Sequence, residues 1–345
     1  MRVLFIGGTG NISTACTRHA LEKNLEVYHL NRGSHPEKAP KGVTTLRADI
    51  RNVDEVRRAL AGLRVDCVVE WLGYHPQHVE ADIALFRDRT GQYVFISSAS
   101  AYCKPLPHPV ITESNPLGNP FWEYSRNKIA CERLLERAWE DSRFPYTVVR
   151  PSHTYDDGWI PTCFVSRDYT VARRILDGKE IVVPGDGQSL WTLTHASDFA
   201  RGFTGLLGNP AAIGQAFHIT SDESLTWDSI HQTIGRALGA DPRIVHVPSD
   251  FVARVCPERG ASLLGDKSHS VLFDNAKIKR HVPGFHAEII FAEGIRRSLA
   301  WLDAHPDAKT VDPAVNGEYE KVLELWTRAM AAVGGLRGCV RVHDT

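Results

Sequence analysis

The sequence predicts an α/β fold, built on a doubly wound parallel sheet and followed by a smaller, mixed C-terminal lobe. In the first half of the chain, short apolar runs rich in Val, Ile, Phe and Tyr alternate with helical patterns. Such alternation produces a parallel sheet that is covered by helices on both faces. The first apolar run also breaks into a glycine-rich turn that opens a helix, which is typical of the Rossmann type of this fold.

Six strands and four helices are expected in this first half. The predicted strands cover residues 2–6, 25–30, 43–48, 66–72, 92–97 and 146–150. The predicted helices cover residues 13–23, 53–61, 78–87 and 124–140. Ligands bind outside the carboxyl ends of the strands in such sheets. The fifth strand ends there in a hydroxyl-rich segment, Ser97-Ser98-Ala99-Ser100.

After Pro151, prolines and glycines interrupt the pattern, which indicates a second lobe. We expect a dinucleotide-binding domain over residues 1–165, to which residues 192–221 return with a strand at 216–220. A substrate lobe is expected over residues 166–191 and 222–333, with its last amphipathic helix at 318–331. The polar, glycine-containing tail over residues 334–345 is expected to be mobile.

The composition is that of a soluble globular protein, with 43% hydrophobic and 23% charged residues and a net charge of −1. This balance leaves no global field that would attract nucleic acid or an anionic membrane. No apolar run reaches the ~20 residues that span a bilayer, and the first strand is too short for a signal-peptide core. The seven scattered cysteines indicate a reducing cytoplasm, and the sixteen histidines show no metal-ligand spacing, so no metal is expected.

The turn after the first strand predicts a dinucleotide-binding site. Glycines allow the tight turn and let backbone N–H groups approach a pyrophosphate, which then lies at the positive end of the following helix. A tight turn without a ligand is the alternative, but the strand before it and the helix after it favour the dinucleotide. The expected contacts in this turn are Gly7, Thr9, Gly10, Asn11 and Ile12.

Two later strand ends indicate which dinucleotide binds. The second strand ends at Asn31 and Arg32, where an acidic residue would bind the ribose 2′-hydroxyl of NAD. Arg32 is instead suited to the 2′-phosphate of NADP, although a solvent-exposed arginine is the alternative. Asp49 is expected to accept a hydrogen bond from the adenine amine, or else to cap the next helix. With Ile50 and Leu72 as further contacts, the cofactor is NAD or NADP, with a preference for NADP.

Tyr124 and Lys128 are four residues apart at the start of a predicted helix, which places both side chains on one face. An ammonium beside a phenol favours the phenolate and lowers its pKa from about 10, which makes a usable general base. The spacing alone occurs by chance. Here Ser98 ends a strand 26 residues before Tyr124, and the glycine turn lies upstream of both.

With these motifs in this order, the chain resembles the extended short-chain dehydrogenase/reductase family, in its NAD-dependent epimerase and dehydratase branch. The matching segments are GGTGNIS, ADIRN, SSASAY, YSRNK, RPSHTY, PGDGQSLW and WDSIHQTIGRALG. The resemblance implies that Ser98 and Tyr124 hydrogen-bond the reacting hydroxyl and that Tyr124 takes its proton. It also implies that Lys128 lowers the pKa of the tyrosine and holds the nicotinamide ribose. The cofactor then accepts a hydride from the same carbon, and a homodimer is expected.

The two residues after Ser98 indicate which reaction of this branch is catalysed. Dehydratases of the branch carry an Asp-Glu pair there to move protons during water loss, whereas this chain has Ala99 and Ser100. The segment is more similar to the Ser-Ala-Thr of UDP-galactose 4-epimerases. Ser100 is then a second hydroxyl contact to the sugar, or alternatively a strand-end hydroxyl that bonds to nearby backbone.

Two departures from the family pattern concern the substrate. Trp191 stands where the family has an arginine for the diphosphate of a nucleotide sugar, and an indole cannot act as an anion clamp. It is expected either to stack on the substrate or to pack in the interior. His153 replaces an asparagine, which directs an imidazole toward the substrate. Tyr74 and His75, after the fourth strand, are expected to overhang the same pocket, with plain surface histidines as the alternative.

The leading hypothesis is an NAD(P)-dependent epimerase that acts on a sugar or sugar nucleotide through a transient ketone. An NADP-dependent dehydrogenase or ketoreductase with the same residues is the alternative, which Arg32 and Trp191 favour. A distant alternative is an RNA-binding protein of the same fold, because chloroplast stem-loop RNA-binding proteins also resemble this branch. The sequence has no basic stripe with interleaved aromatic residues, so no nucleic-acid partner is expected.

Overall fold

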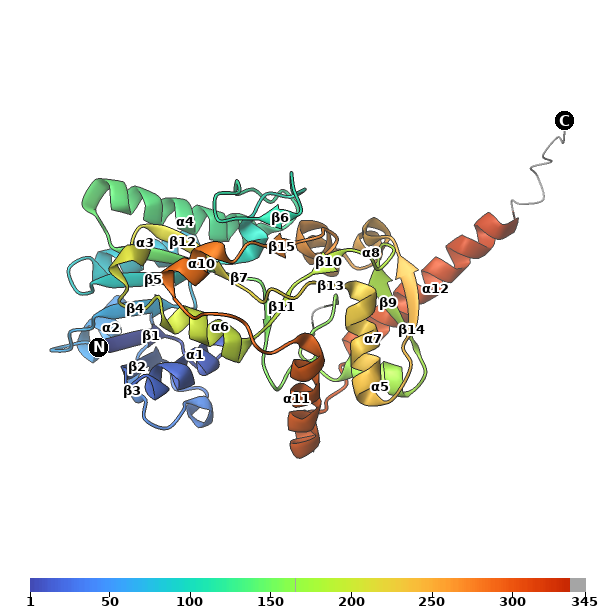
Figure 1. The fold of residues 1–345 in the computed structure, drawn as a ribbon, viewed down its shortest axis with the longest axis horizontal. Helices are drawn as coiled ribbons and strands as arrows, with labels where there is room; N and C mark the ends of the chain where they lie inside the picture. Colours follow the sequence, from blue (N-terminus) through green and yellow to red (C-terminus); the bar gives the residue numbers. More distant parts are fainter. Residues whose placement is uncertain (165, 336–345) are drawn as a thin grey trace.

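The computed structural model describes residues 1–164 and 166–335. Its centre is a seven-stranded parallel sheet in the order β12-β7-β5-β4-β1-β2-β3 (Figure 1). The strand order reverses between β1 and β4, which is where ligands bind in such sheets. The strands are β1 (Arg2–Ile6), β2 (Glu26–Asn31), β3 (Thr44–Arg47), β4 (Cys67–Glu70), β5 (Gln92–Ile96), β7 (Tyr146–Pro151) and β12 (Gln215–Ile219).

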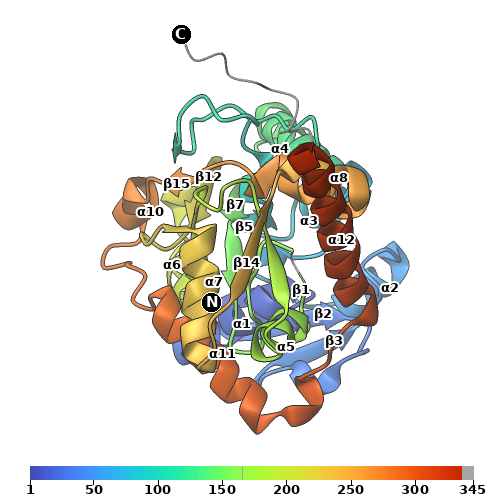
Figure 2. The ribbon, with the colours of Figure 1, turned by 90° about the vertical axis from the view of Figure 1, so that its right-hand side faces the viewer.

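Helices cover both faces of the sheet, so the predicted doubly wound α/β fold is confirmed (Figures 1 and 2). One face packs against α2 (Val53–Ala59), α3 (Pro76–Phe86) and α4 (Glu123–Ser142). The other packs against α1 (Asn11–Glu22), α6 (Ala196–Thr204) and α10 (Ala276–His281). All six strands and all four helices predicted in the first half are present, with bounds that differ by a few residues.

A second core lies beyond the carboxyl ends of the strands, and its short strands form mixed pairs. Three of the pairs are parallel: β9 (Glu180–Pro184) with β14 (Arg243–Val247), β8 (His153–Tyr155) with β11 (Leu193–His195), and β6 (Val110–Ile111) with β15 (Leu272–Phe273). The pair of β10 (Leu190–Trp191) and β13 (Leu225–Thr226) is antiparallel. Between these pairs the chain returns to the first sheet, where β12 adds to β7.

Helices surround this second core. They are α5 (Thr170–Leu176), α7 (Trp227–Leu238), α8 (Ser249–Val255), α9 (Pro257–Ser262), α11 (Phe291–Ala304) and α12 (Pro313–Gly335), with the π-helical turn η4 (Leu263–Lys267). Short 3-10 turns lie at η1 (Pro36–Lys38), η2 (Ala99–Ala101), η3 (Pro210–Ala212) and η5 (Pro306–Ala308). Helix α12 extends away from the rest of the molecule (Figure 1). Beyond Gly335, the predicted tail lies outside the described residues.

A buried ion pair joins α4 to the sheet. Arg150, in β7, donates from Nε to both carboxylate oxygens of Glu132, at 3.1 and 3.2 Å, and from Nη2 to Oε2 at 2.5 Å. Glu132 also accepts a hydrogen bond from the hydroxyl of Ser97 at the end of β5. Both charged side chains are at least 95% buried, with 4% and 1% exposed. This network fixes the position of α4 relative to the ends of two neighbouring strands.

The ion pair makes a prediction about stability. Arg150→Met leaves the Glu132 carboxylate buried without its counter-ion, so we expect a loss of about 3–5 kcal/mol in the free energy of unfolding. Urea denaturation measures this loss. The double variant Arg150→Met, Glu132→Leu is the control, and it is expected to recover part of the loss because no buried charge remains. A single variant as stable as the unsubstituted protein would contradict the assignment.

Candidate active site

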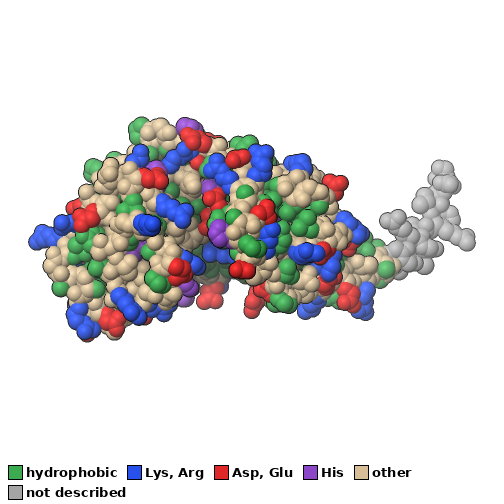
Figure 3. All heavy atoms as spheres, turned by 90° about the horizontal axis from the view of Figure 1, so that it is seen from below, with side chains coloured by type: hydrophobic (Ala, Val, Ile, Leu, Met, Phe, Trp, Pro, Cys, Tyr) green, Lys and Arg blue, Asp and Glu red, His purple; other side chains and the backbone are tan. Residues whose placement is uncertain are grey.

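A cavity of about 820 Å³ lies at the carboxyl ends of the central strands and is closed on its other side by the second lobe. The molecular surface is hollowed between the two halves of the molecule (Figure 3). The glycine turn, the ends of β2 to β5 and the start of α4 form one side of the cavity. All the predicted site residues line it except His75.

The glycine turn approaches β2 too closely for any other residue. Gly7 and Gly8 have φ values of 103° and 97°, which strain residues with a Cβ. A Cβ on Gly8 would lie 2.5 Å from Nε2 of His29. The His29 ring is buried, bonds through Nε2 to the hydroxyl of Thr17 at 2.9 Å, and is neutral because burial lowers its pKa to about 4. His29 therefore forms a fixed floor beneath the turn.

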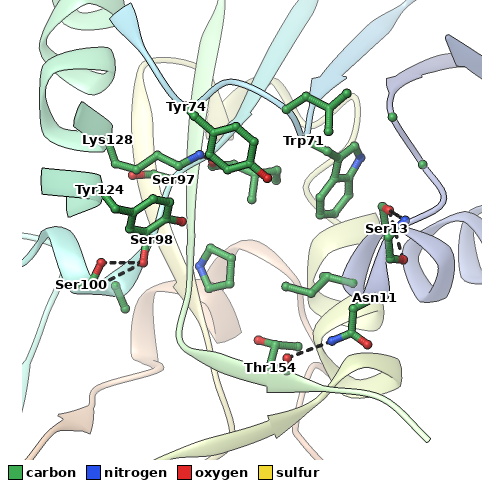
Figure 4. Close-up of a pocket in the computed structure, with 18 of the residues that line it drawn as sticks. Asn11, Ser13, Trp71, Tyr74, Ser97, Ser98, Ser100, Tyr124, Lys128 and Thr154 are labelled. Carbon is green, nitrogen blue, oxygen red and sulfur yellow. Dashed lines mark hydrogen bonds between the residues drawn. The ribbon is translucent and has the colours of Figure 1, made fainter. Parts of the chain in front are cut away.

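The start of α1 fits a dinucleotide pyrophosphate. The N–H groups of the first helical turn have no carbonyl partner within the helix, and they lie at the positive end of its dipole. The N–H of Gly10 donates to Ser13 Oγ at 2.8 Å, which closes the turn. Asn11 Nδ2 donates to the carbonyl of Thr154 at 3.1 Å and ties the helix to β8 (Figure 4). Ile12, Ile50 and Leu72 add apolar wall to this end of the cavity.

The strand ends that are expected to contact the cofactor are polar, and some of their side chains already make hydrogen bonds within the chain. Asn31 Oδ1 accepts from the N–H of Gly33 at 2.9 Å, and Arg32 is exposed beside it at the cavity. Asp49 accepts from the N–H of Arg51 at 2.9 Å. It does not cap the next helix, since Asn52 holds that position and accepts from the N–H of Glu55.

The hydroxyl segment after β5 forms a short hydrogen-bonded chain. Ser125 donates to Ser100 Oγ at 2.7 Å, and the hydroxyls of Ser100 and Ser98 are 2.9 Å apart (Figure 4). Ser98 Oγ also accepts from the N–H of Ser100 at 3.2 Å. When Ser100 donates to it, Ser98 can donate its own proton to Tyr124 or to an oxygen of a ligand in the cavity. Ser97 is occupied with Glu132 instead.

Tyr124 and Lys128 extend from α4 toward Ser98 (Figure 4). Lys128 is buried, and its ammonium donates to the carbonyls of Gly73 at 2.8 Å and Ile96 at 2.7 Å. Burial lowers the pKa of Lys128 to about 8. Burial also raises the pKa of Tyr124, against a smaller lowering by its hydrogen bond with Ser98. This differs from the lowering by lysine expected from the sequence, because the ammonium faces backbone carbonyls and lies 5.8 Å from the centre of the tyrosine ring.

The loop after β4 directs one of its two aromatic candidates into the cavity. Tyr74 is 45% exposed and lies between the glycine turn and Tyr124, with a ring-to-ring distance of 6.4 Å to the latter (Figure 4). His75 lies outside the cavity lining, 3.2 Å from Asn127 Nδ2, so its predicted place in the pocket is wrong. His78 lines the cavity instead, because the helix begins at Pro76, two residues earlier than expected, and carries His78 in its first turn.

Trp191 and His153 form a hydrogen-bonded pair on the second-lobe side. Trp191 is 2% exposed and stacks on Trp227 at 5.3 Å, so packing is its main role. Its indole N–H donates to His153 Nδ1 at 3.3 Å. His153 is neutral because burial lowers its pKa to about 3. With Nδ1 as the acceptor, the ring proton is on Nε2, a buried atom without a hydrogen-bond partner among the described residues.

Several residues of the cavity were missed in the sequence. Arg51 lies two residues after Asp49 at a strand end, and its charge at that position could have predicted that it lines the cavity. The others belong to no motif and come from separate loops and helix ends; they are Lys104, Trp122, Trp159, Arg167, Asp266 and Lys267. Within residues 1–164 and 166–335, no group of three or more His, Cys, Asp or Glu is arranged to hold a metal ion. No helix of that same part of the chain is both long and apolar enough to cross a bilayer.

Together, the sheet, the glycine turn and the Ser-Tyr-Lys group define a dinucleotide-binding enzyme of the oxidoreductase type. The family model described as NAD dependent epimerase/dehydratase family matches residues 3–220, and the chain belongs to that family. Its curated relatives include reductases, dTDP-glucose 4,6-dehydratases and a UDP-glucose 4-epimerase.

Individual relatives cover most of the chain. A 2'-dehydrokanamycin reductase of Streptomyces kanamyceticus is 28% identical over 289 residues, which are 83% of this chain and 80% of the relative. A chloroplast stem-loop binding protein of 41 kDa from Arabidopsis thaliana is 24% identical over 314 residues, 86% of this chain and 78% of the relative. The structure of a UDP-glucose 4-epimerase from Bifidobacterium longum, solved with NAD+ and UDP, superposes with a TM-score of 0.71. It is 19% identical and covers 89% of this chain and 100% of its own, a likeness of fold.

The buried ammonium of Lys128 makes a prediction about pH. Its pKa is about 8 in the folded protein, below the ordinary value of 10.5, so between these pH values the unfolded chain binds the extra proton. The free energy of unfolding should therefore rise by about 2–3 kcal/mol from pH 8 to 10.5, relative to Lys128→Met. Denaturation at several pH values measures the difference. The variant Lys41→Met, at an exposed position, is the matched control: it keeps Lys128 and should follow the pH profile of the unsubstituted protein. Equal pH profiles for the unsubstituted protein and Lys128→Met would refute the prediction.

Proposed function

We propose that this protein is an NAD(P)-dependent epimerase, which oxidises a secondary alcohol of a sugar-type substrate and returns the hydride to the other face of the ketone. The observation that supports it is the convergence of Ser98, Tyr124 and Lys128 on one wall of a cavity whose opposite wall is the glycine turn (Figure 4). Neither residue after Ser98 is an acid, since Ala99 and Ser100 stand there, which favours hydride chemistry without elimination of water.

The residues of the chain divide between holding the cofactor and moving the proton. The start of α1 suits the pyrophosphate, Asp49 the adenine, Arg32 a 2′-phosphate and Lys128 the nicotinamide ribose. When bound, the dinucleotide accepts and returns a hydride at the substrate carbon. Ser98 donates its free hydrogen bond to the substrate oxygen, and Tyr124 exchanges the proton of that oxygen.

Net reduction of a ketone by NADPH is the second candidate. Burial raises the pKa of Tyr124, and a neutral phenol is the form that donates a proton to the oxygen of a ketone. Arg32 lies exposed at the cavity beside Asn31, an amide at a position where a carboxylate would repel a 2′-phosphate. The 2'-dehydrokanamycin reductase relative adds support, since its name describes a reduction.

The role of Tyr124 is tested by Tyr124→Phe, which removes the hydroxyl and keeps the ring. We expect turnover to fall by roughly 10²–10⁴-fold, because proton transfer in the transition state is lost. The affinity for the dinucleotide, measured by calorimetry, should not change. Tyr74→Phe is the matched control on the same cavity and should keep most of the activity. Undiminished turnover in Tyr124→Phe would refute the assignment.

The two candidate functions differ in their cofactor balance. An epimerase converts one sugar isomer into another with no net change in the absorbance of reduced nicotinamide, and it is expected to co-purify with its dinucleotide. A reductase consumes one NADPH for each ketone. Mass spectrometry of the purified protein and absorbance during turnover therefore decide between them.

A further inference from the structure

The cavity is strongly positive, although the chain as a whole has a net charge of −1. Six Lys or Arg side chains line it against two Asp side chains, an excess of four positive charges. Arg32, Arg51 and Lys128 lie on the side that suits the dinucleotide. The other cations, with Asp266, extend from the substrate side, and nothing in the proposed hydride chemistry requires them.

Lys104 lies on this substrate side, four residues after Ser100. Its side chain is fully buried, and Nζ is 3.8 Å from Asp266 Oδ1, too far for a hydrogen bond. The ammonium has no hydrogen-bond partner among the described residues. An ammonium carries three donors, and burying them without acceptors is costly. A ligand that supplied oxygens to Nζ would remove this cost.

Lys267 lies across Asp266 from Lys104. It is 4% exposed, and its Nζ is 3.7 Å from Asp266 Oδ2. The ammonium lies over the rings of Trp122 at 5.5 Å and Trp191 at 5.7 Å, contacts that favour a cation. One carboxylate thus faces two ammonium groups, which leaves one positive charge in excess.

The turn that carries Asp266 and Lys267 is held in place through its backbone. Asn119 Nδ2 donates to the carbonyl of Gly265 at 2.7 Å and to that of Ser100 at 2.9 Å. Trp227 Nε1 donates to the carbonyl of Lys267 at 2.9 Å. These buried hydrogen bonds fix η4 against the hydroxyl segment, so the charged group is positioned before any ligand arrives.

We propose that Lys104 and Lys267 form an anion subsite, and that the substrate carries a compact oxyanion, a carboxylate or a phosphate monoester, close to its reacting hydroxyl. The inference rests on the proposed function for the identity of that hydroxyl. The ring of Trp122, over which the Lys267 ammonium lies, is 5.0 Å from the ring of Tyr124, which places the subsite near the proton-transfer group. The group of Lys104, Asp266 and Lys267 carries one excess charge, which matches a compact anion, while Arg167, the remaining cation on this side, lies over the ring of Trp159 at 5.0 Å. At position 191 an uncharged indole cannot act as a clamp for a nucleoside diphosphate.

Binding to the Tyr124→Phe protein, saturated with NAD+, tests the subsite without turnover. The probes are D-glucuronate, D-glucose 1-phosphate, neutral D-glucose and UDP-glucose, with calorimetry as the measurement. Lys104→Met and Lys267→Met should each weaken the better anionic probe about tenfold or more, because a charged hydrogen bond is lost. Binding of D-glucose should stay unchanged, and Asp266→Asn should strengthen the anionic probe. The preferred probe shows whether the oxyanion is a carboxylate or a phosphate.

Lys277→Met is the matched control. Lys277 is partly buried, and its ammonium lies over the ring of Phe217 at 4.8 Å, as that of Lys267 lies over its tryptophans, but Lys277 is outside the cavity. Thermal unfolding verifies that each variant folds. The subsite is overturned if no anionic monosaccharide binds, if the two lysine variants bind it as tightly as the parent, or if only UDP-glucose depends on the lysines. Hydride transfer to NAD(P)+ in the protein with Tyr124 intact is measured separately, so failure of the proposed function is distinguishable from failure of the subsite.

Discussion

The ion pair between Arg150 and Glu132 is the contact on which the geometry of the site depends. The Ser-Tyr-Lys group comes from two elements, the end of β5 and the start of α4, so its geometry depends on the contacts that hold these elements together. Glu132 accepts from Arg150 of β7 and from Ser97, the residue after β5, so one carboxylate joins the helix to both strand ends. Desolvation of this pair is expensive, and the several hydrogen bonds to the same carboxylate offset it.

Lys128 adds a second connection between the same elements. Its ammonium donates to Ile96, the last residue of β5, and to Gly73 in the loop after β4. Gly73 is close-packed, since a Cβ there would lie 2.9 Å from the ring of Phe95. The lysine therefore positions the loop that carries Tyr74 while it remains on the cavity wall. A group that the resemblance assigns to the cofactor also determines the shape of the site.

The local parts of the fold and the site could be predicted from the sequence. The glycine turn, Ser98, Tyr124 and Lys128 belong to single segments whose spacing determines where they lie. His75 was misplaced because a shift of the helix start by two residues changes which side chain faces the cavity. Lys104 and Lys267 could not be predicted, because they are 163 positions apart and are brought to the same carboxylate by contacts between distant segments, among them the hydrogen bonds of Asn119 and Trp227. The sequence shows a tryptophan in place of the expected arginine. Its stacking on Trp227 could not be predicted, because it depends on β10 pairing with β13.

That stacking has a consequence for how the substrate range of this chain can change over evolutionary time. Trp191 is held on one face by Trp227 and at its edge by His153. An arginine at position 191 would bury a guanidinium beside the ammonium of Lys267, which lies 5.7 Å from the centre of the Trp191 ring, so it would need a new acidic partner. A single substitution to arginine at this position is therefore costly, which restricts how the substrate range of this chain can change there.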